Sequence, residues 1–170
     1  MTRSVYVLGA GAHPWGKWPD KPQLQLAHEA MNLALADASL AWPDVQGLVA
    51  ASSRFEGGMG WGLHANEVVQ SVAEQGIPCI NVGGACAAGA VAFQTAYALI
   101  ASGQHDVVAV LGAERRHATA VNGDGGHAGA HTAHADDFDD FVAGIAKRDT
   151  GEADRELGRI HVRQVTECVH

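Results

Sequence analysis

Short apolar runs alternate with longer segments of helical periodicity over the first 114 residues, and this alternation limits the chain to few folds. The apolar runs lie at residues 5–8, 48–51, 79–82 and 106–111. The first run, which Gly9-Ala10-Gly11 closes, suits a buried parallel strand. Apolar side chains with helical spacing fill residues 24–40, 63–74 and 85–101. Strands separated by helices of about ten or more residues predict βαβ units in a layered α/β fold.

The character of the chain changes after Glu114, which predicts two unequal domains, residues 1–114 and residues 115–170. Large apolar residues become sparse in the second part, and six of the ten histidines lie there. Its pattern predicts one helix near residues 138–147 and one short strand at residues 160–165. We expect the remainder of this Gly/His/Asp-rich tail to be loop or disordered. A shifted reading frame would also produce so abrupt a change, and translation of the other two frames past Glu114 tests that hypothesis.

Charge and composition exclude several classes of function. The net charge of −8 and the lack of a Lys/Arg cluster argue against nucleic acid as a partner. No apolar run is long enough to span a membrane, and the first residues lack the apolar core of a signal peptide. The three cysteines are too few for a disulfide framework, which favours a reducing, cytoplasmic compartment.

One cysteine lies where a predicted strand turns into a predicted helix. Gly83 and Gly84 allow a tight turn, and Cys86 then stands at the head of the helix over residues 85–101. The unpaired N–H groups and partial positive charge of a helix N-terminus favour thiolate over thiol and offer donors to an oxyanion. Cys86 is therefore the candidate catalytic nucleophile. Local chemistry leaves open that it is a small buried apolar residue, the role we expect for Cys79 inside its strand.

A longer set of motifs accompanies Cys86. They comprise a strand entry, an asparagine, the cysteine turn, a helix end and a following strand, namely Gly76-Ile77-Pro78, Asn81, Cys86-Ala87-Ala88-Gly89, Ile100-Ala101-Ser102-Gly103, Asp106-Val107 and Gly112-Ala113-Glu114. The amino end adds Val5-Tyr6-Val7-Leu8-Gly9, His13-Pro14-Trp15-Gly16-Lys17 and Ala36-Asp37-Ala38. Together these motifs make residues 4–114 resemble the N-terminal half of thiolases, especially those of the lipid-transfer-protein or sterol-carrier-protein-x type.

The resemblance implies a five-layered α/β/α/β/α enzyme of two similar halves, of which this chain would hold the first. In that family the nucleophilic cysteine, here Cys86, takes an acyl group from an acyl-CoA thioester, and carbon–carbon bond cleavage or formation follows. Acyl-CoA is the substrate, and no bound cofactor or metal is implied. Family members are normally dimeric. Related ones work beside a partner subunit with an OB-fold and a zinc ribbon, and some of those cleave steroid side chains by a retro-aldol reaction.

The chain departs from the family pattern at two points. Gly83-Gly84 and Ala88 replace polar residues that usually surround the cysteine, so we expect looser support of Cys86. Nothing after Glu114 matches the Gly-His-Pro histidine or the second cysteine of the family's second half. A nucleophile without its base is a weak catalyst, since base assistance contributes roughly 10²–10⁴-fold. The motifs therefore predict either an acyltransferase that lacks its C-terminal bases or a non-catalytic fragment that serves as a scaffold subunit.

The histidine-rich tail predicts no specific metal site. His127, His131 and His134, followed by Asp136 and Asp137, have the ligand chemistry of a zinc site. However, the glycines among them disfavour the helix that would gather them on one face.

The remaining polar and aromatic residues have simpler interpretations. His64 and Glu67 share one face of a predicted helix, which is expected to be solvated. The tryptophans at positions 15, 18, 42 and 61 are expected to pack in loops or at a dimer interface. Gly9-Ala10-Gly11 lacks the third glycine of a dinucleotide site. Without a second half, the outer face of the helix over residues 85–101 would be exposed, which predicts a homo-oligomer or a partner subunit.

Overall fold

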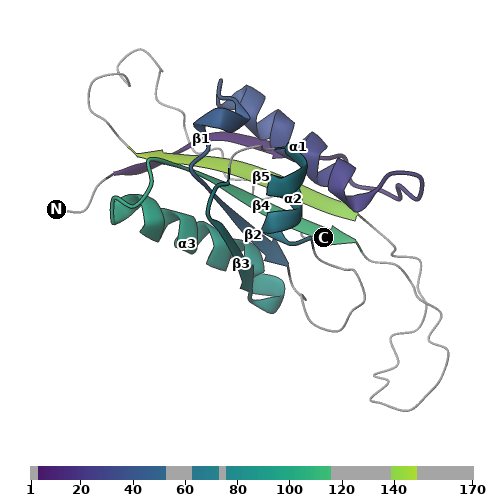
Figure 1. Cartoon of the computed structure of the whole chain (residues 1–170). Helices are drawn as coiled ribbons and strands as arrows, with labels where there is room; N and C mark the ends of the chain where they lie inside the picture. Colours follow the sequence, from purple (N-terminus) through teal and green to yellow (C-terminus); the bar gives the residue numbers. More distant parts are fainter. Residues whose placement is uncertain (1–3, 53–62, 73–75, 116–138, 149–170) are drawn as a thin grey trace.

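One mixed five-stranded sheet organises the chain, with helices on both of its faces (Figure 1). The computed structural model describes residues 4–52, 63–72, 76–115 and 139–148. In sheet order the strands are β1 (Val5–Ala12), β5 (Asp139–Arg148), β4 (Val107–Arg115), β2 (Gly47–Ser52) and β3 (Cys79–Gly83). Strand β2 pairs in parallel with β3 and β4, whereas β5 runs antiparallel to β1 and β4. The predicted α/β class is confirmed.

The helices divide unequally between the two faces of the sheet. Helices α1 (Gln23–Asp37) and α2 (Ala65–Val72) cover one face, and α3 (Ala88–Ala101) covers the other (Figure 1). Two short 3-10 turns, η1 (Trp42–Asp44) and η2 (Ala85–Ala87), precede β2 and α3. Every residue of β2 is buried, and successive side chains point to opposite faces, so it contributes to both cores. This two-sided burial explains why the sequence of β2 is a continuous apolar run.

The helix predicted near residues 138–147 is wrong, because this segment forms strand β5 in the interior of the sheet. Ala143 and Ile145 pack into the core under α1, and Ala146 packs into the core under α3. A strand that is covered on both faces has no two-residue alternation, so its short apolar run resembles that of a buried helix. Its conformation is decided by hydrogen bonding to β1 on one side and to β4 on the other. The strand predicted at residues 160–165 and the rest of the predicted tail lie outside the described residues.

The prediction for β1 also needs correction. The strand continues through the glycines to Ala12, and it is an edge strand paired antiparallel with β5 instead of a buried parallel one. Gly9 and Gly11 face the backbone of α1 and leave no room for a Cβ atom, because that atom would overlap the backbone at Ala30 and Ala34. The glycines therefore allow a close approach of strand and helix, and they do not end the strand.

A histidine joins α1 to α2. His28 Nε2 donates a hydrogen bond to Ser71 Oγ at 2.6 Å, because the Ser71 hydroxyl proton is directed to the Val68 carbonyl oxygen at 2.7 Å. The His28 ring also lies edge-on to Trp42, with 6.5 Å between ring centroids. Its Nδ1 atom is buried and has no hydrogen-bond partner within the described part of the chain. Burial lowers the pKa of His28 below its ordinary value of 6.5.

This lowered pKa predicts a loss of stability in mild acid. The unfolded chain keeps the ordinary histidine pKa, so just below pH 6.5 it binds more protons at His28 than the folded chain does. We expect the free energy of unfolding to fall as the pH drops below about 6.5. Urea denaturation across this range should show a shallower pH dependence in His28→Gln than in the parent. Equal pH dependence of the free energy of unfolding in the two proteins would contradict the prediction.

Candidate nucleophile site

Cys86 lies at the edge of the sheet where three parallel strands end. Ser52, the last residue of β2, pairs with Gly83, the last residue of β3, and β4 reaches the same edge. Three residues beyond β3, Cys86 occupies the centre of turn η2, and its side chain is exposed. The sequence predicts a helix from residue 85, with Cys86 in its first turn. In the structure the α-helix begins at Ala88, so Cys86 stands in the 3-10 turn before the helix. An exposed sulfur at the carboxyl edge of a sheet is open to a substrate.

The backbone of this turn is strained next to the cysteine. Ala85 has a φ of 47°, in the left-handed region that a residue with a Cβ rarely adopts. Such a conformation costs about 1–3 kcal/mol and persists only where the surrounding structure holds it. Two hydrogen bonds close the turn, from Ala87 N to the Gly84 oxygen at 2.9 Å and from Ala88 N to the Ala85 oxygen. These two amides are engaged within the turn, so donors for an oxyanion would have to come from other groups.

The two glycines before the turn differ in the space around them. A Cβ on Gly84 would lie 3.1 Å from Val91 Cγ2 and 3.2 Å from the backbone of Ala88, so a larger residue there requires a shift of α3. A Cβ on Gly83 would meet no heavy atom of the described chain within 4 Å. A polar side chain at position 83 would therefore fit the present backbone, whereas one at position 84 would require its neighbours in α3 to move by a few tenths of an ångström.

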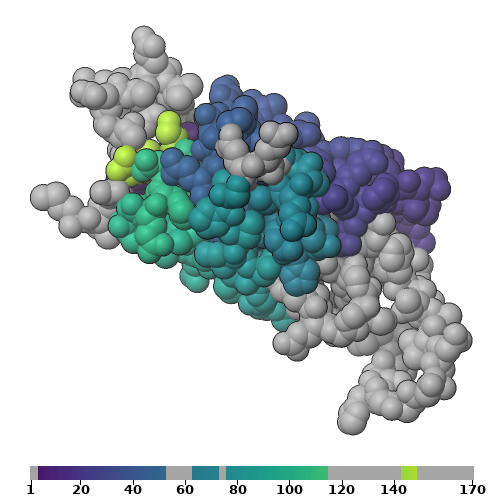
Figure 2. Space-filling model, viewed as in Figure 1, coloured from purple at the N-terminus to yellow at the C-terminus, as the bar shows by residue number. Residues whose placement is uncertain are grey.

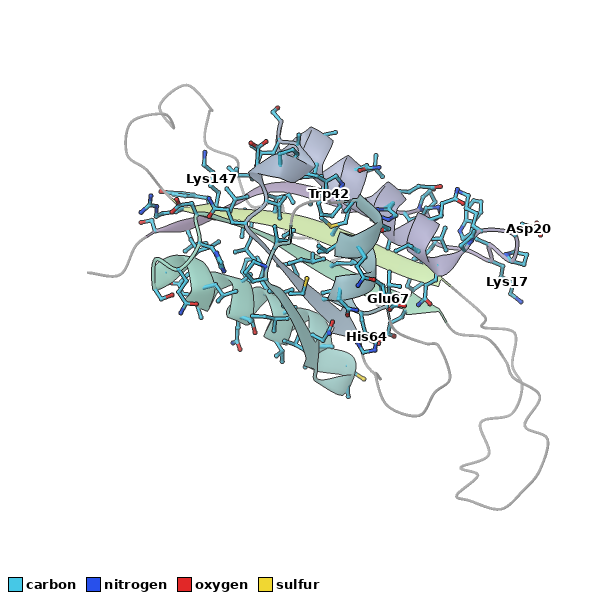
Figure 3. The ribbon with its side chains drawn as sticks, viewed as in Figure 1. Lys17, Asp20, Trp42, His64, Glu67 and Lys147 are labelled. Atoms are coloured by element: carbon cyan, nitrogen blue, oxygen red, sulfur yellow. The ribbon has the colours of Figure 1, made fainter. Side chains whose placement is uncertain are left out.

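The first turn of α2 lies beside the same edge of the sheet. Leu63 and Ala65 are buried there, and His64 is exposed between them. The His64 backbone N–H donates to Glu67 Oε2 at 2.8 Å, which satisfies one of the free amides at the start of the helix. Figure 3 shows both side chains on this end of α2. The sequence predicts a merely solvated face for this pair, but the Glu67 carboxylate is a helix cap.

Asn81 connects α2 to the strand that carries the cysteine turn. Its Oδ1 atom accepts a hydrogen bond from Ala65 N at 2.8 Å, so the side chain caps α2 from β3. Asn81 is part of the sequence motif around Cys86, but the motif alone does not reveal this contact. The two partners are 16 residues apart, and only the packing of α2 against β3 brings them together.

The other cysteine in the described residues has a different environment. Cys79 is half-buried at the start of β3, and its thiol donates to the Ile77 carbonyl oxygen at 3.4 Å. Burial raises the pKa of the Cys79 thiol and therefore disfavours its thiolate. This agrees with the unreactive role that the sequence predicts for Cys79. Cys168 lies outside the described residues.

The structure gives no support to a metal site or a membrane span in the residues that it describes. All five His and Asp residues of the predicted zinc-type cluster, from His127 to Asp137, fall outside. Among the residues that the structure does describe, no group of three or more His, Cys, Asp or Glu side chains is placed to hold a metal ion. No helix in this part of the chain is long and apolar enough to cross a membrane.

Of the tryptophans, only Trp61 lies outside the described residues. Trp18 packs edge-on against the buried His13 ring, with 4.9 Å between centroids, and Lys21 Nζ lies 5.0 Å from the Trp18 ring. Trp42 packs against the core under α1, whereas Trp15 is exposed. The predicted packing role therefore holds for Trp18 and Trp42.

Comparison with known proteins decides the family. Residues 5–144 match the N-terminal domain of thiolase. The chain belongs to the thiolase family. The match extends 30 residues past Glu114, from 114 to 144, and reaches into β5, which the motifs in the sequence did not identify.

Individual relatives support the lipid-transfer-type resemblance. The thiolase chain is 32% identical over 114 residues to "Non-specific lipid-transfer protein-like 2" of Caenorhabditis elegans, a match that covers 65% of this chain and 26% of that protein. It is also similar to the "Ltp2-ChsH2(DUF35) aldolase", at 28% identity and a TM-score of 0.50, over 64% of this chain and 27% of that one. The chain thus spans about a quarter of the length of these relatives.

A more distant structure confirms the fold. The 3-oxoacyl-[acyl-carrier-protein] synthase III of Aquifex aeolicus VF5 has a TM-score of 0.61 with this chain, at 15% identity, over 86% of this chain and 55% of that one. At this identity the likeness concerns the fold alone.

Proposed function

We propose that this thiolase chain is the acyl-accepting part of an acyl-CoA acyltransferase of the lipid-transfer type, with Cys86 as its nucleophile. The observation that carries the proposal is the exposed Cys86 side chain in a strained turn at the carboxyl edge of the sheet. Backbone strain of this kind is concentrated at functional sites. The likeness to a lipid-transfer-protein-like relative supports the same assignment.

The proposed step is a transfer of the acyl group between two sulfur atoms. The Cys86 thiolate attacks the carbonyl carbon of an acyl-CoA thioester and forms a new carbon–sulfur bond. The carbon–sulfur bond to coenzyme A then breaks, and the coenzyme A thiolate leaves and takes up a proton. No oxidant or reductant is needed, because one thioester replaces another.

The groups that complete the reaction would come from outside this chain. Since the chain spans 26% of its lipid-transfer-protein-like relative, a second half or partner subunit would supply the base and the groups that act on the substrate carbon. Helix α3 contains no charged residue, and Phe93 and Tyr97 on its outer face are 46% and 45% exposed. Figure 2 views the molecule from the side on which α2, β3 and α3 reach the surface. An uncharged helix face with large apolar side chains suits burial against a further layer of protein.

A second candidate function is a subunit of a retro-aldolase that acts on acyl-CoA thioesters. The likeness to the "Ltp2-ChsH2(DUF35) aldolase" favours it, and that structure also suggests a partner subunit for this chain. A non-catalytic scaffold role would follow if Cys86 showed no special reactivity.

Acylation of the full chain by acetyl-CoA and by a long-chain acyl-CoA tests the proposal. Mass spectrometry of proteolytic peptides should find the acyl group on Cys86, which we expect to react at least about tenfold faster than Cys79, whose burial disfavours the thiolate. Cys86→Ala should abolish the modification, whereas Cys79→Ala should leave it unchanged. Equal modification of Cys79, Cys86 and Cys168 would instead support the non-catalytic role.

A further inference from the structure

Among the described residues, the strand that carries the cysteine turn has a paired neighbour on one side only. Within the part of the chain that the structure describes, β3 lies at the edge of the sheet and pairs with β2, through Leu48–Cys79 to Ser52–Gly83. Its side chains are half-buried or exposed, so core packing holds it less firmly than it holds β2. A further contact at the end of β3 from which the turn departs would therefore add to its support.

The hydrogen bond between Asn81 and Ala65 is such a contact. Asn81 lies two residues before the end of β3 and five before Cys86, and its Oδ1 accepts from Ala65 N at 2.8 Å. Ala65 is fully buried and is the first residue of α2, which in turn packs on β2 and β3. The contact thus attaches the end of β3 to a helix anchored in the core.

The position of this contact matters because the next segment is strained. Ala85 holds a left-handed φ of 47°, which a free turn would relax. The local hydrogen bonds of the turn run among Gly84, Ala85, Ala87 and Ala88, and none of them reaches β2 or α2. The orientation of the turn relative to the rest of the molecule therefore depends on the two elements that it joins, α3, which packs in the core, and β3, which enters it from the edge of the sheet.

We propose that Asn81 is a positioning residue for Cys86: by tying β3 to the first turn of α2, it holds the strained turn in the orientation that presents the sulfur to a thioester. This rests on the proposed function of Cys86 as acyl acceptor. In this role Asn81 acts through β3 and α2 and not on the reacting atoms.

Two substitutions separate the acceptor oxygen from side-chain size. Asn81→Leu keeps a similar size and removes the acceptor, whereas Asn81→Asp keeps an oxygen that accepts from Ala65 N and places a negative charge at a helix N-terminus, where it is favourable. We expect Asn81→Leu to slow acylation of Cys86 by acetyl-CoA about 10- to 100-fold, after correction for the folded fraction. Asn81→Asp should stay within about threefold of the parent, given the retained hydrogen bond.

A second readout does not depend on acylation. NMR amide and ¹³Cβ shifts of Ala85 and Cys86 should move in Asn81→Leu and should stay close to those of the parent in Asn81→Asp. If they stay in place in Asn81→Leu, or if Asn81→Asp loses acylation as fully as Asn81→Leu, the positioning role is refuted. A parent chain that acetyl-CoA does not acylate would overturn the proposed function alone, and the shifts would still decide whether Asn81 positions the turn.

Discussion

Replacing Gly11 with alanine should destabilise the fold by about 3 kcal/mol or more, because the added methyl group has no space against α1. A Cβ at this position would overlap the backbone oxygen of Ala30 and the backbone nitrogen of Ala34. Backbone atoms of a helix cannot move aside like the end of a flexible side chain, so β1 and α1 would have to separate. That separation would open the core on this face of the sheet, where Ala30 and Ala34 are fully buried. Urea denaturation followed by circular dichroism measures the loss.

Gly144→Ala is the matched control for this substitution. Gly144 lies in the neighbouring strand β5, and a Cβ there would be 3.9 Å from its nearest neighbour, the Gly9 carbonyl oxygen, which is an ordinary contact. We expect its free energy of unfolding to change by less than about 1 kcal/mol. If Gly11→Ala and Gly144→Ala were equally stable, β1 and α1 could not lie as close together as the structure places them.

An aspartate in place of Ile145 should prevent folding altogether. Ile145 is fully buried in β5, between β1 and β4, and belongs to the core under α1. A carboxyl group there would have to be buried without a partner or force the sheet apart, at a cost of several kcal/mol. This cost is comparable with the whole stability of a typical domain, about 5–15 kcal/mol. Circular dichroism and one-dimensional NMR should show an unfolded or aggregated chain.

Lys147→Ala provides the comparison in the same strand. Lys147 lies two residues further along β5 and is only half-buried, so its truncation should change stability by less than about 0.5 kcal/mol. If Ile145→Asp folded as well as Lys147→Ala, β5 would not occupy the interior of the sheet. The pair therefore tests the element that the sequence pattern assigned to a helix.

Local pattern was sufficient for most elements before residue 115. Helix α1 and strands β2 and β3 lie within three residues of their predicted limits, because period-3.6 spacing and continuous apolar runs are properties of adjacent residues. Strand β5 was missed for the opposite reason. Its apolar residues pack on both faces, so the segment has no distinctive period, and its conformation depends on two strands more than 20 residues before it, β1 and β4.

The candidate site divides in the same way. Cys86, the small residues around it and the strand–turn–helix order are local features, and the sequence predicts them together with the family that the comparison confirmed. Of the two side chains that cap the start of α2, Glu67 is within reach of local sequence patterns and Asn81 is not. Glu67 lies three residues after His64, but Asn81 reaches Ala65 across 16 residues.

By itself, then, the sequence determined the family, the candidate nucleophile, and the helices and strands whose periodicity depends on neighbouring residues. Tertiary structure alone decided that β5 enters the sheet, that the glycines of β1 lie against α1, that Ala85 beside Cys86 has a strained φ, and that Asn81 caps α2. The physical reason is that each of these depends on contacts between segments far apart in the chain. Such contacts form only when the burial of two faces of one sheet brings the segments together.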